Sequence, residues 1–243
     1  MNITLLGAKI SSKKMQETLS EISSYIKKGS FHHVITLNAE ILYRAQTDPE
    51  LMEIINAADI VTPDGAGIVW ASKVLGKPVQ ERVTGIDLTL ALVEEAQRKG
   101  WRLAFFGGKP GVAREAANNL QKKHPKLKIV GTYHGYLSSN EQDVFRREMT
   151  ELNPDILLVA IGAPKQEFWI RENKELDIPV MMGVGGSLDV IAGKAKRAPK
   201  WMQKVHLEWL YRLIREPWRY KRMLALPKFI WLVIKVKFKI KDK

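Results

Sequence analysis

Three short motifs in this 243-residue chain carry a carboxylate, an amide or a hydroxyl, and two of them lie beside glycine or proline. Asp64 stands between Pro63 and Gly65, Asn38 follows shortly after Thr36, and Gln166 follows Gly-Ala-Pro-Lys. An aspartate on such a turn can act as a general base. It can equally cap the next helix, a common role worth about 1 kcal/mol, and from the residues alone the cap is favoured. Gln166 can donate and accept hydrogen bonds at once, as a sugar hydroxyl or a uracil edge requires.

Two glycine-rich loops are candidates for binding an anion. Gly107–Gly111 and Gly183–Gly186 each follow an apolar run, and glycines let backbone amides approach a phosphate at a helix start. Neither loop is a Walker or GxGxxG sequence, so each alone can be a simple tight turn. Two such loops together favour a nucleotide-like ligand. Arg82 precedes a helix-opening glycine, where it can either clamp a diphosphate or pair with Glu81 at the surface.

The sequence predicts no essential metal and no cofactor. The five histidines lack metal-ligand spacing, and there is neither an HExxH motif nor an Asp-x-Asp pair. The absence of cysteine excludes disulfides and thiolate metal sites. A nicotinamide-dependent enzyme is disfavoured because no GxGxxG follows the first strands.

The elements that must position these residues follow an α/β pattern. Short β-branched runs alternate with stretches of helical spacing, which predicts a Rossmann-like, largely parallel sheet flanked by helices. The predicted strands are 33–37, 60–62, 102–106, 128–132, 156–161 and 180–183, with 3–10 as an additional edge strand. The predicted helices are 13–28, 39–45, 51–57, 67–75, 86–98, 112–123 and 141–152. The polar motifs fall at the carboxyl ends of the strands, where open α/β sheets bind ligands.

The net charge of +13 lies entirely in the last fifty residues. Residues 194–243 hold 16 basic and 3 acidic side chains and four of the seven tryptophans, whereas residues 1–193 hold 23 of each charge. We therefore divide the chain into a catalytic α/β domain, 1–193, and a basic, membrane-associating appendage, 194–243. A nucleic-acid-binding tail is the rival interpretation, but it leaves the glycine loops, Asp64 and Gln166 unexplained.

The appendage is predicted to lie on a membrane rather than to cross it. Its longest apolar run, 229–234, is far shorter than a spanning helix needs, and the N-terminus does not resemble a signal peptide. Residues 201–215 show amphipathic helical spacing, while 234–241 alternate with period two, closer to a strand. An exposed apolar face would also favour self-association. We expect a chain ending near residue 194 to remain folded and to lose most activity on a lipid acceptor.

Nine stretches, in order along nearly the whole chain, resemble the WecG/TagA/CpsF glycosyltransferases of bacterial cell-surface polymer synthesis. These stretches are 36–40 (TLNAE), 62–65 (TPDG), 81–85 (ERVTG), 106–108 (FGG), 162–167 (GAPKQE), 183–186 (GVGG), 197–199 (RAP), 207–210 (LEWL) and 216–217 (EP). The chain is most similar to the wall teichoic acid branch, the N-acetylmannosaminyltransferases.

The resemblance implies a reaction and its substrates. N-acetylmannosamine would pass from UDP to the 4-hydroxyl of N-acetylglucosamine on undecaprenyl diphosphate, with inversion to a β linkage, at the cytoplasmic face of the cell membrane. A related UDP-sugar, such as N-acetylmannosaminuronic acid or glucose, is the alternative donor. Inversion needs one base and no covalent enzyme intermediate. The family motif raises Asp64 above the capping role and makes it our candidate base.

The resemblance also suggests roles for the other motif residues. Thr36, Asn38 and Gln166 would position sugar hydroxyls or the donor phosphate, and Arg82 would offset the charge that develops on the diphosphate. The remaining candidates form two sets. The UDP pocket would be formed by Gly107, Gly108, Tyr136, Gly185, Gly186 and Asp189. The acceptor lipid or the membrane would be met by Arg197, Arg212, Arg215, Arg219 and Arg222.

Overall fold

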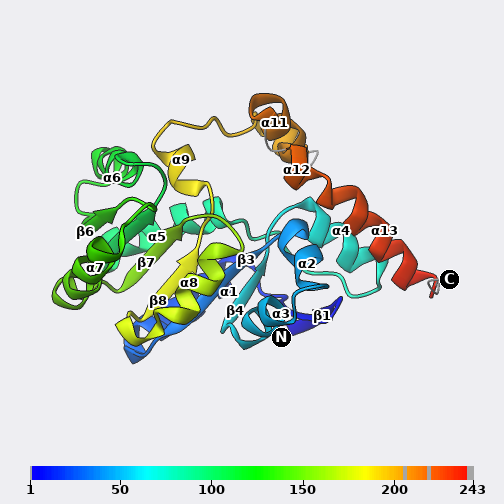
Figure 1. Cartoon of the computed structure of the whole chain (residues 1–243), viewed down its shortest axis with the longest axis horizontal. Coiled ribbons are helices and arrows are strands. Elements are labelled where there is room, and N and C mark those ends of the chain that lie inside the picture. Colours follow the sequence, from blue (N-terminus) through cyan, green and yellow to red (C-terminus); the bar gives the residue numbers. More distant parts are fainter. Residues whose placement is uncertain (1, 205–206, 218–219, 240–243) are drawn as a thin grey trace.

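A six-stranded parallel sheet forms the centre of the molecule (Figure 1). A computed structural model of the chain describes residues 2–204, 207–217 and 220–239. The strand order is β4-β3-β8-β7-β5-β6. The strands are β3 (His32–Leu37), β4 (Ile60–Pro63), β5 (Arg102–Gly107), β6 (Lys128–Tyr133), β7 (Ile156–Ala160) and β8 (Val180–Gly183). The predicted sheet and its six strands are confirmed, with ends shifted by at most one residue.

Helices cover both faces of this sheet. One face carries α1 (Met15–Lys28), α5 (Gly85–Lys99), α6 (Val112–Lys123) and α9 (Ser187–Ile191). The other carries α2 (Ala39–Ala45), α3 (Pro49–Ala57), α4 (Ala66–Val74), α7 (Ser139–Leu152), α8 (Lys165–Glu172) and α13 (Ala225–Lys237), with the short 3-10 helix η1 (Lys174–Leu176) after α8. Side chains alternate along each strand, so Leu103 and Phe105 enter the first core while Ala104 and Phe106 enter the second.

The N-terminal segment differs from the prediction of an additional edge strand. It forms a separate two-stranded antiparallel sheet of β1 (Asn2–Leu5) and β2 (Ala8–Ser11). Leu6 and Gly7 both have positive φ and turn the chain between the two strands, which divides the predicted strand. Leu5 and Ile10 are buried against the core shared by α2, α3 and α4.

Two predictions for the appendage were wrong. The single helix predicted for 201–215 is divided into α10 (Lys200–Lys204) and α11 (Glu208–Arg215). Leu207 is not helical, and its N–H reaches back five residues to the carbonyl of Met202. The stretch 234–241, predicted as closer to a strand, is helical as far as Lys237 in α13, and its last two residues, 240 and 241, lie outside the described residues. Its alternation is overridden because α13 is anchored one turn earlier by buried residues.

Those anchors are Phe229 and Val233, which are 1% and 0% exposed and lie four residues apart on one helix face. They pack into the core of α2 and α4, and α12 (Tyr220–Met223) leads into this helix. Figure 1 shows α13, in red, lying against α2 and α4. The division at residue 194 therefore follows the charge of the chain, whereas the last helix shares the core of the first domain. That residues 1–193 fold alone stays a prediction.

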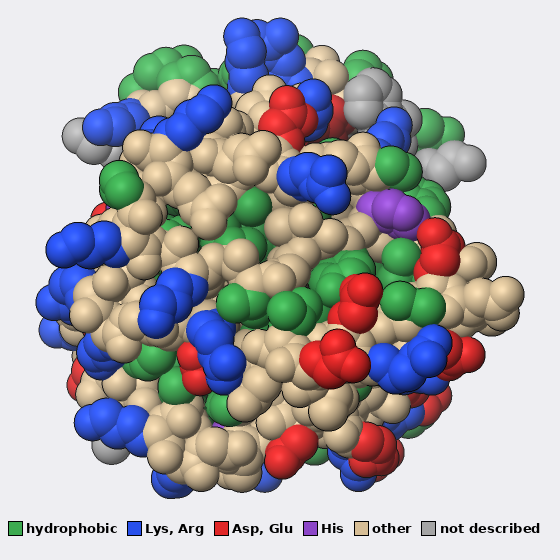
Figure 2. Space-filling view, turned by 90° about the vertical axis from the view of Figure 1, so that its left-hand side faces the viewer, with side chains coloured by type: hydrophobic (Ala, Val, Ile, Leu, Met, Phe, Trp, Pro, Cys, Tyr) green, Lys and Arg blue, Asp and Glu red, His purple; other side chains and the backbone are tan. Residues whose placement is uncertain are grey.

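The surface of the α/β part carries charges of both signs, as its composition predicts. Figure 2 shows the end of the molecule opposite α13, where basic and acidic side chains are both spread over the face. Within the described residues, no helix combines the length and hydropathy needed to cross a membrane. The same residues contain no cluster of three His, Asp or Glu side chains that could hold a metal ion.

Candidate active site

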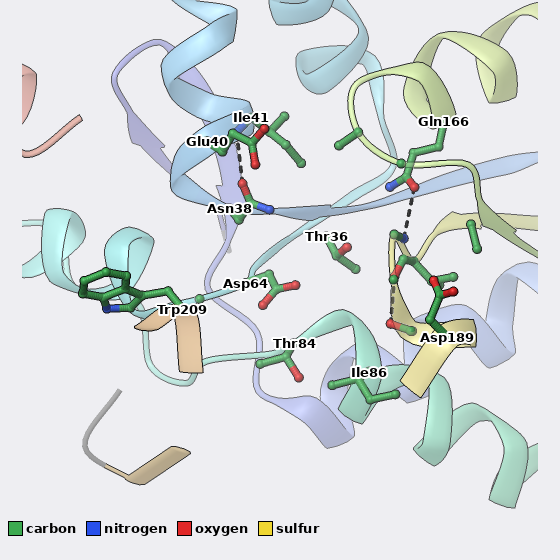
Figure 3. Close-up of a pocket in the computed structure, with 18 of the residues that line it drawn as sticks. Thr36, Asn38, Glu40, Ile41, Asp64, Thr84, Ile86, Gln166, Asp189 and Trp209 are labelled. Atoms are coloured by element: carbon green, nitrogen blue, oxygen red, sulfur yellow. Dashed lines mark hydrogen bonds between the residues drawn. The ribbon is translucent and has the colours of Figure 1, made fainter. Parts of the chain in front are cut away.

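A cavity of about 630 Å³ opens at the carboxyl edge of the sheet, where ligands bind in open α/β folds. Its walls come from the ends of β3, β4, β7 and β8 and from the appendage (Figure 3). Ten of the predicted site residues line it together: Thr36, Asn38, Asp64, Arg82, Gly108, Tyr136, Gln166, Gly185, Gly186 and Asp189. Residues spread over more than 150 positions of the sequence thus line one cavity.

Asp64 lies in the middle of this group, in the turn between the end of β4 and the start of α4 (Figure 3). It does not cap α4, whose N-cap position is Gly65 without a side-chain hydrogen bond. Its Oδ2 instead accepts the N–H of Gly85, at 3.2 Å, in the first turn of α5. A helix N-terminus favours negative charge, so this contact fixes the carboxylate at the start of α5.

Thr36 and Asn38 flank Asp64 on the neighbouring strand end. The Thr36 hydroxyl donates to the carbonyl of Gly183 at 2.9 Å, which ties the end of β3 to the glycine loop after β8. Asn38 Oδ1 accepts the N–H of Ile41 at 3.0 Å and so caps α2. The cap occupies the oxygen of the Asn38 amide, whose nitrogen is a donor suited to a sugar hydroxyl in the cavity.

Gln166 is 2% exposed and is held between the glycine loop and its own helix. Its Oε1 accepts the N–H of Gly185 at 3.0 Å, and its Nε2 donates to Glu167 at 2.9 Å. A Cβ at Gly183 would come within 2.5 Å of Gln166 Nε2, so only glycine permits this approach. The structure thus gives Gln166 a packing role that the motif alone did not reveal, at a wall of the cavity.

Arg82 does not pair with Glu81 as one interpretation of the sequence had it. Its Nη1 lies 2.9 Å from Glu208 on α11, and both side chains are about one-fifth exposed. Arg197 lies 2.7 Å from Asp87 and 3.7 Å from Glu208. Burial alone would raise the pKa of Asp87, but hydrogen bonds from Arg197 and Thr84 hold it below its usual value. This group links the appendage to the start of α5.

The remaining nucleotide candidates occupy the opposite wall. Gly108, Tyr136 and Asp189 line the cavity, and Tyr136 is 67% exposed. Gly107 lies beneath them rather than among them. A Cβ there would come within 2.4 Å of the backbone of Ala160, so Gly107 serves the packing of β5 on β7.

The structure describes only some of the arginines predicted to meet the acceptor lipid or the membrane. Arg197 is in the charged group described above, and Arg215 is exposed with its guanidinium 5.7 Å from the ring of Tyr211. Arg212 lies on α11 and Arg222 on α12, but their side chains are not described, and Arg219 lies outside the described residues.

Several lining residues were missed by the sequence analysis. They are Glu40, Thr84, Lys109, Glu208 and Trp209, and all but Lys109 lie inside stretches quoted for the family resemblance. Trp209, from α11, stands at the edge of the cavity beside Asp64 (Figure 3). Its position indicates that the appendage forms part of the cavity wall, which no spacing in the sequence could show.

A parallel α/β sheet with an aspartate, two amides and two glycine loops at one carboxyl edge has its polar groups where open α/β proteins bind their small-molecule ligands. The comparison with known proteins identifies the protein family. The chain belongs to the glycosyl transferase WecG/TagA/CpsF family, whose profile matches residues 3–243. The resemblance drawn from the motifs is confirmed.

Relatives from three bacteria are similar along almost the whole chain. The N-acetylglucosaminyldiphosphoundecaprenol N-acetyl-beta-D-mannosaminyltransferases of Bacillus spizizenii and Bacillus subtilis are both 36% identical over 227 residues. These alignments cover 89% and 91% of this chain and 87% and 88% of the relatives. The enzyme of the same name from Staphylococcus aureus is 33% identical over 242 residues, covering 98% of this chain and 94% of that protein.

Proposed function

We propose that the chain transfers an N-acetyl-β-D-mannosaminyl group from its UDP donor to the 4-hydroxyl of N-acetylglucosaminyldiphosphoundecaprenol, which forms the linkage unit of wall teichoic acid. The family membership and the names of the three relatives support the reaction. The observation that carries it in the structure is the single cavity that joins Asp64 to both glycine loops.

Inversion proceeds by one in-line displacement, and Asp64 is the proposed base. Its carboxylate takes the proton of the acceptor 4-hydroxyl while that oxygen forms the bond to the anomeric carbon of the donor sugar. The bond from the anomeric carbon to the diphosphate oxygen breaks on the opposite side, and UDP leaves with the electron pair. Thr36 and Asn38, which lie beside Asp64 in Figure 3, hold sugar hydroxyls during this step in our proposal.

The leaving diphosphate needs positive charge and N–H donors. We assign the glycine loop Gly185–Gly186 to the UDP side of the cavity, with Gly108, Tyr136 and Asp189. Arg82 lines the cavity while it is paired with Glu208. A guanidinium has five N–H donors, so one ion pair leaves donors for a phosphate oxygen.

The lipid acceptor implies that the enzyme works at a membrane surface. Support comes from the outer side of α13 and its end, where Ile230, Trp231 and Phe238 are 44%, 58% and 70% exposed beside several lysines. Flotation with vesicles of phosphatidylglycerol and phosphatidylcholine tests this. The wild-type chain should float, and a Trp231→Ala, Phe238→Ala variant should float several-fold less; equal flotation would contradict the assignment.

The reaction itself is tested by mass spectrometry with a panel of UDP-sugars and an N-acetylglucosaminyl diphospholipid. UDP-N-acetylmannosamine should give the fastest turnover, and a preference for the uronic acid or for glucose would place the chain in another branch of the family. Asp64→Asn should lower kcat by about 10²- to 10⁴-fold and retain UDP binding. Asp143→Asn, on an aspartate whose side chain is 69% exposed, is the matched control. If the Asp64 variant turned over at the rate of the control, Asp64 would not be the catalytic base.

A further inference from the structure

Glu167 is a fully buried acid directly beside the cavity, and the proposed reaction gives it no role. Its exposed fraction is 0%, and it lies in the first turn of α8. Oε1 accepts a hydrogen bond from Gln166 Nε2 at 2.9 Å, whereas Oε2 has no hydrogen-bond partner among the described residues. A buried carboxyl with an unsatisfied oxygen costs stability, so its presence needs an explanation other than packing.

The contacts on either side of Gln166 explain what the acid can do. An amide has a donor end and an acceptor end, and the N–H of Gly185 requires the acceptor end at 3.0 Å. An ionised carboxylate only accepts, so Glu167 requires the donor end on the other side. Both neighbours therefore demand the same orientation. Turning the amide over would place its nitrogen against the N–H of Gly185 and its oxygen against Glu167.

The Gln166 amide contacts the glycine loop Gly185–Gly186, which lines the cavity, so its orientation affects that loop. Gly185 has a positive φ of 51°, a conformation that glycine adopts easily, and its N–H is held by the Gln166 hydrogen bond. Ser187 follows at the start of α9 and donates its hydroxyl to the carbonyl of Val184, which closes the turn. The loop is thus fixed from within by its own turn and from outside by the Gln166 amide.

We propose that Glu167 is a positioning residue, which sets the orientation of the Gln166 amide and through it the shape of the Gly185–Gly186 loop that receives the donor nucleotide. The proposal rests on the proposed function, because it takes that loop as part of the UDP site. Glu167 touches no substrate and acts only through Gln166. When ionised, the Glu167 carboxylate is a strict acceptor and therefore selects one end of the amide.

Three chains compared at pH 8 test the role: wild type, Glu167→Gln and Glu167→Met. Met fills a similar volume and offers the amide no strong acceptor, while Gln keeps an acceptor oxygen but can also turn its own donor toward Gln166. We expect kcat/KM for the UDP-sugar to fall at least ten-fold in the Met variant and about three-fold in the Gln variant. The free energy of unfolding of the Gln variant should rise above that of wild type, because a buried charge is gone. Glu172→Gln, on an exposed acid of the same helix, is the matched control.

The opposed directions of activity and stability separate positioning from a purely structural role, which predicts that the two move together. Activity of the Glu167 variants equal to that of the Glu172 control would overturn the proposal. If the Met variant does not fold, the Gln variant decides alone on the same two measurements. Calorimetry with UDP distinguishes a failure of the proposed function from a failure of the role of Glu167. No UDP binding by the wild-type chain would contradict the proposed function, whereas equal UDP affinity and equal kcat/KM in every variant would refute only the role of Glu167.

Discussion

Replacing Glu167 by glutamine should change how the stability of the fold depends on pH. Burial raises the pKa of the Glu167 carboxyl from 4.5 to about 7, against the opposing hydrogen bonds from Gln166 and its own backbone. The folded chain therefore keeps a proton on this group over a range of pH in which the unfolded chain has released it. A glutamine of the same shape carries no such proton.

The sign and size follow from this difference. Wherever the folded state binds more protons than the unfolded state, stability falls as the pH rises. The contribution of Glu167 is thus fully present below pH 4.5, decreases between pH 4.5 and 7, and is lost above about pH 7. A full shift of this size corresponds to roughly 3 kcal/mol at about 1.4 kcal/mol per pKa unit. Between pH 5 and pH 8 the wild-type chain should lose about 2 to 3 kcal/mol that the Glu167→Gln variant keeps.

Urea unfolding followed by tryptophan fluorescence at several pH values measures this effect. Subtracting the wild-type free energy of unfolding from that of the variant cancels the titration of all other groups. The difference should grow steadily in favour of the variant from pH 5 to pH 8. A difference that stays constant across this range would refute the reasoning, because it would mean that Glu167 titrates alike in the folded and unfolded chains.

Three further predictions follow from other contacts. Phe229→Ala should lower the free energy of unfolding by about 3 to 5 kcal/mol, measured in urea, because it opens a hole between α13 and the core; a loss below about 1 kcal/mol would mean that α13 does not pack as described. Gly183→Ala should lower kcat at least ten-fold, in the same mass-spectrometric assay, because its methyl group meets the Gln166 amide. A double-mutant cycle of Arg82→Gln and Glu208→Gln should give a coupling of only about 1 kcal/mol, since the pair is partly exposed to solvent, and additive effects would show that the pair contributes nothing.

The fold could be predicted because its strands and helices follow simple sequence patterns of apolar and capping residues. The strand 102–107 alternates between two buried faces, and α5 is bounded by Thr84 at its start and Gly100 after its end. The pattern failed where tertiary contacts decide. At the last helix, the alternation of 234–241 suggests a strand, but residues 234–237 continue α13, which the burial of Phe229 and Val233 anchors to the core.

The site was predicted to the extent that its residues end strands. Parallel strands bring their carboxyl ends to one edge, so Thr36, Asp64 and the loop after β8 were expected at the same edge. The pairing of β3 with β4 and β8 makes them neighbours. Which partner each side chain chooses is not set by that rule. Asp64 could have capped α4 and Arg82 could have paired with Glu81, but the actual partners are Gly85 and Glu208. Both alternatives are local in sequence, and the structure chose distant contacts instead.

The appendage shows why charge and packing divide this chain differently. Its basic residues give it a separate electrostatic character from residue 194 onward, yet Glu208, one of its three acidic residues, turns back to Arg82 at the cavity. Phe229 and Val233 then return the chain to the core. Under the proposed function, these contacts would hold an acceptor bound at the appendage beside Asp64. The inward contacts of α11 and α13 would then set where the sugar arrives, and the outward aromatic and lysine side chains of α13 would set how the chain meets a membrane. We therefore expect mutations on the two sides to alter turnover and vesicle binding separately.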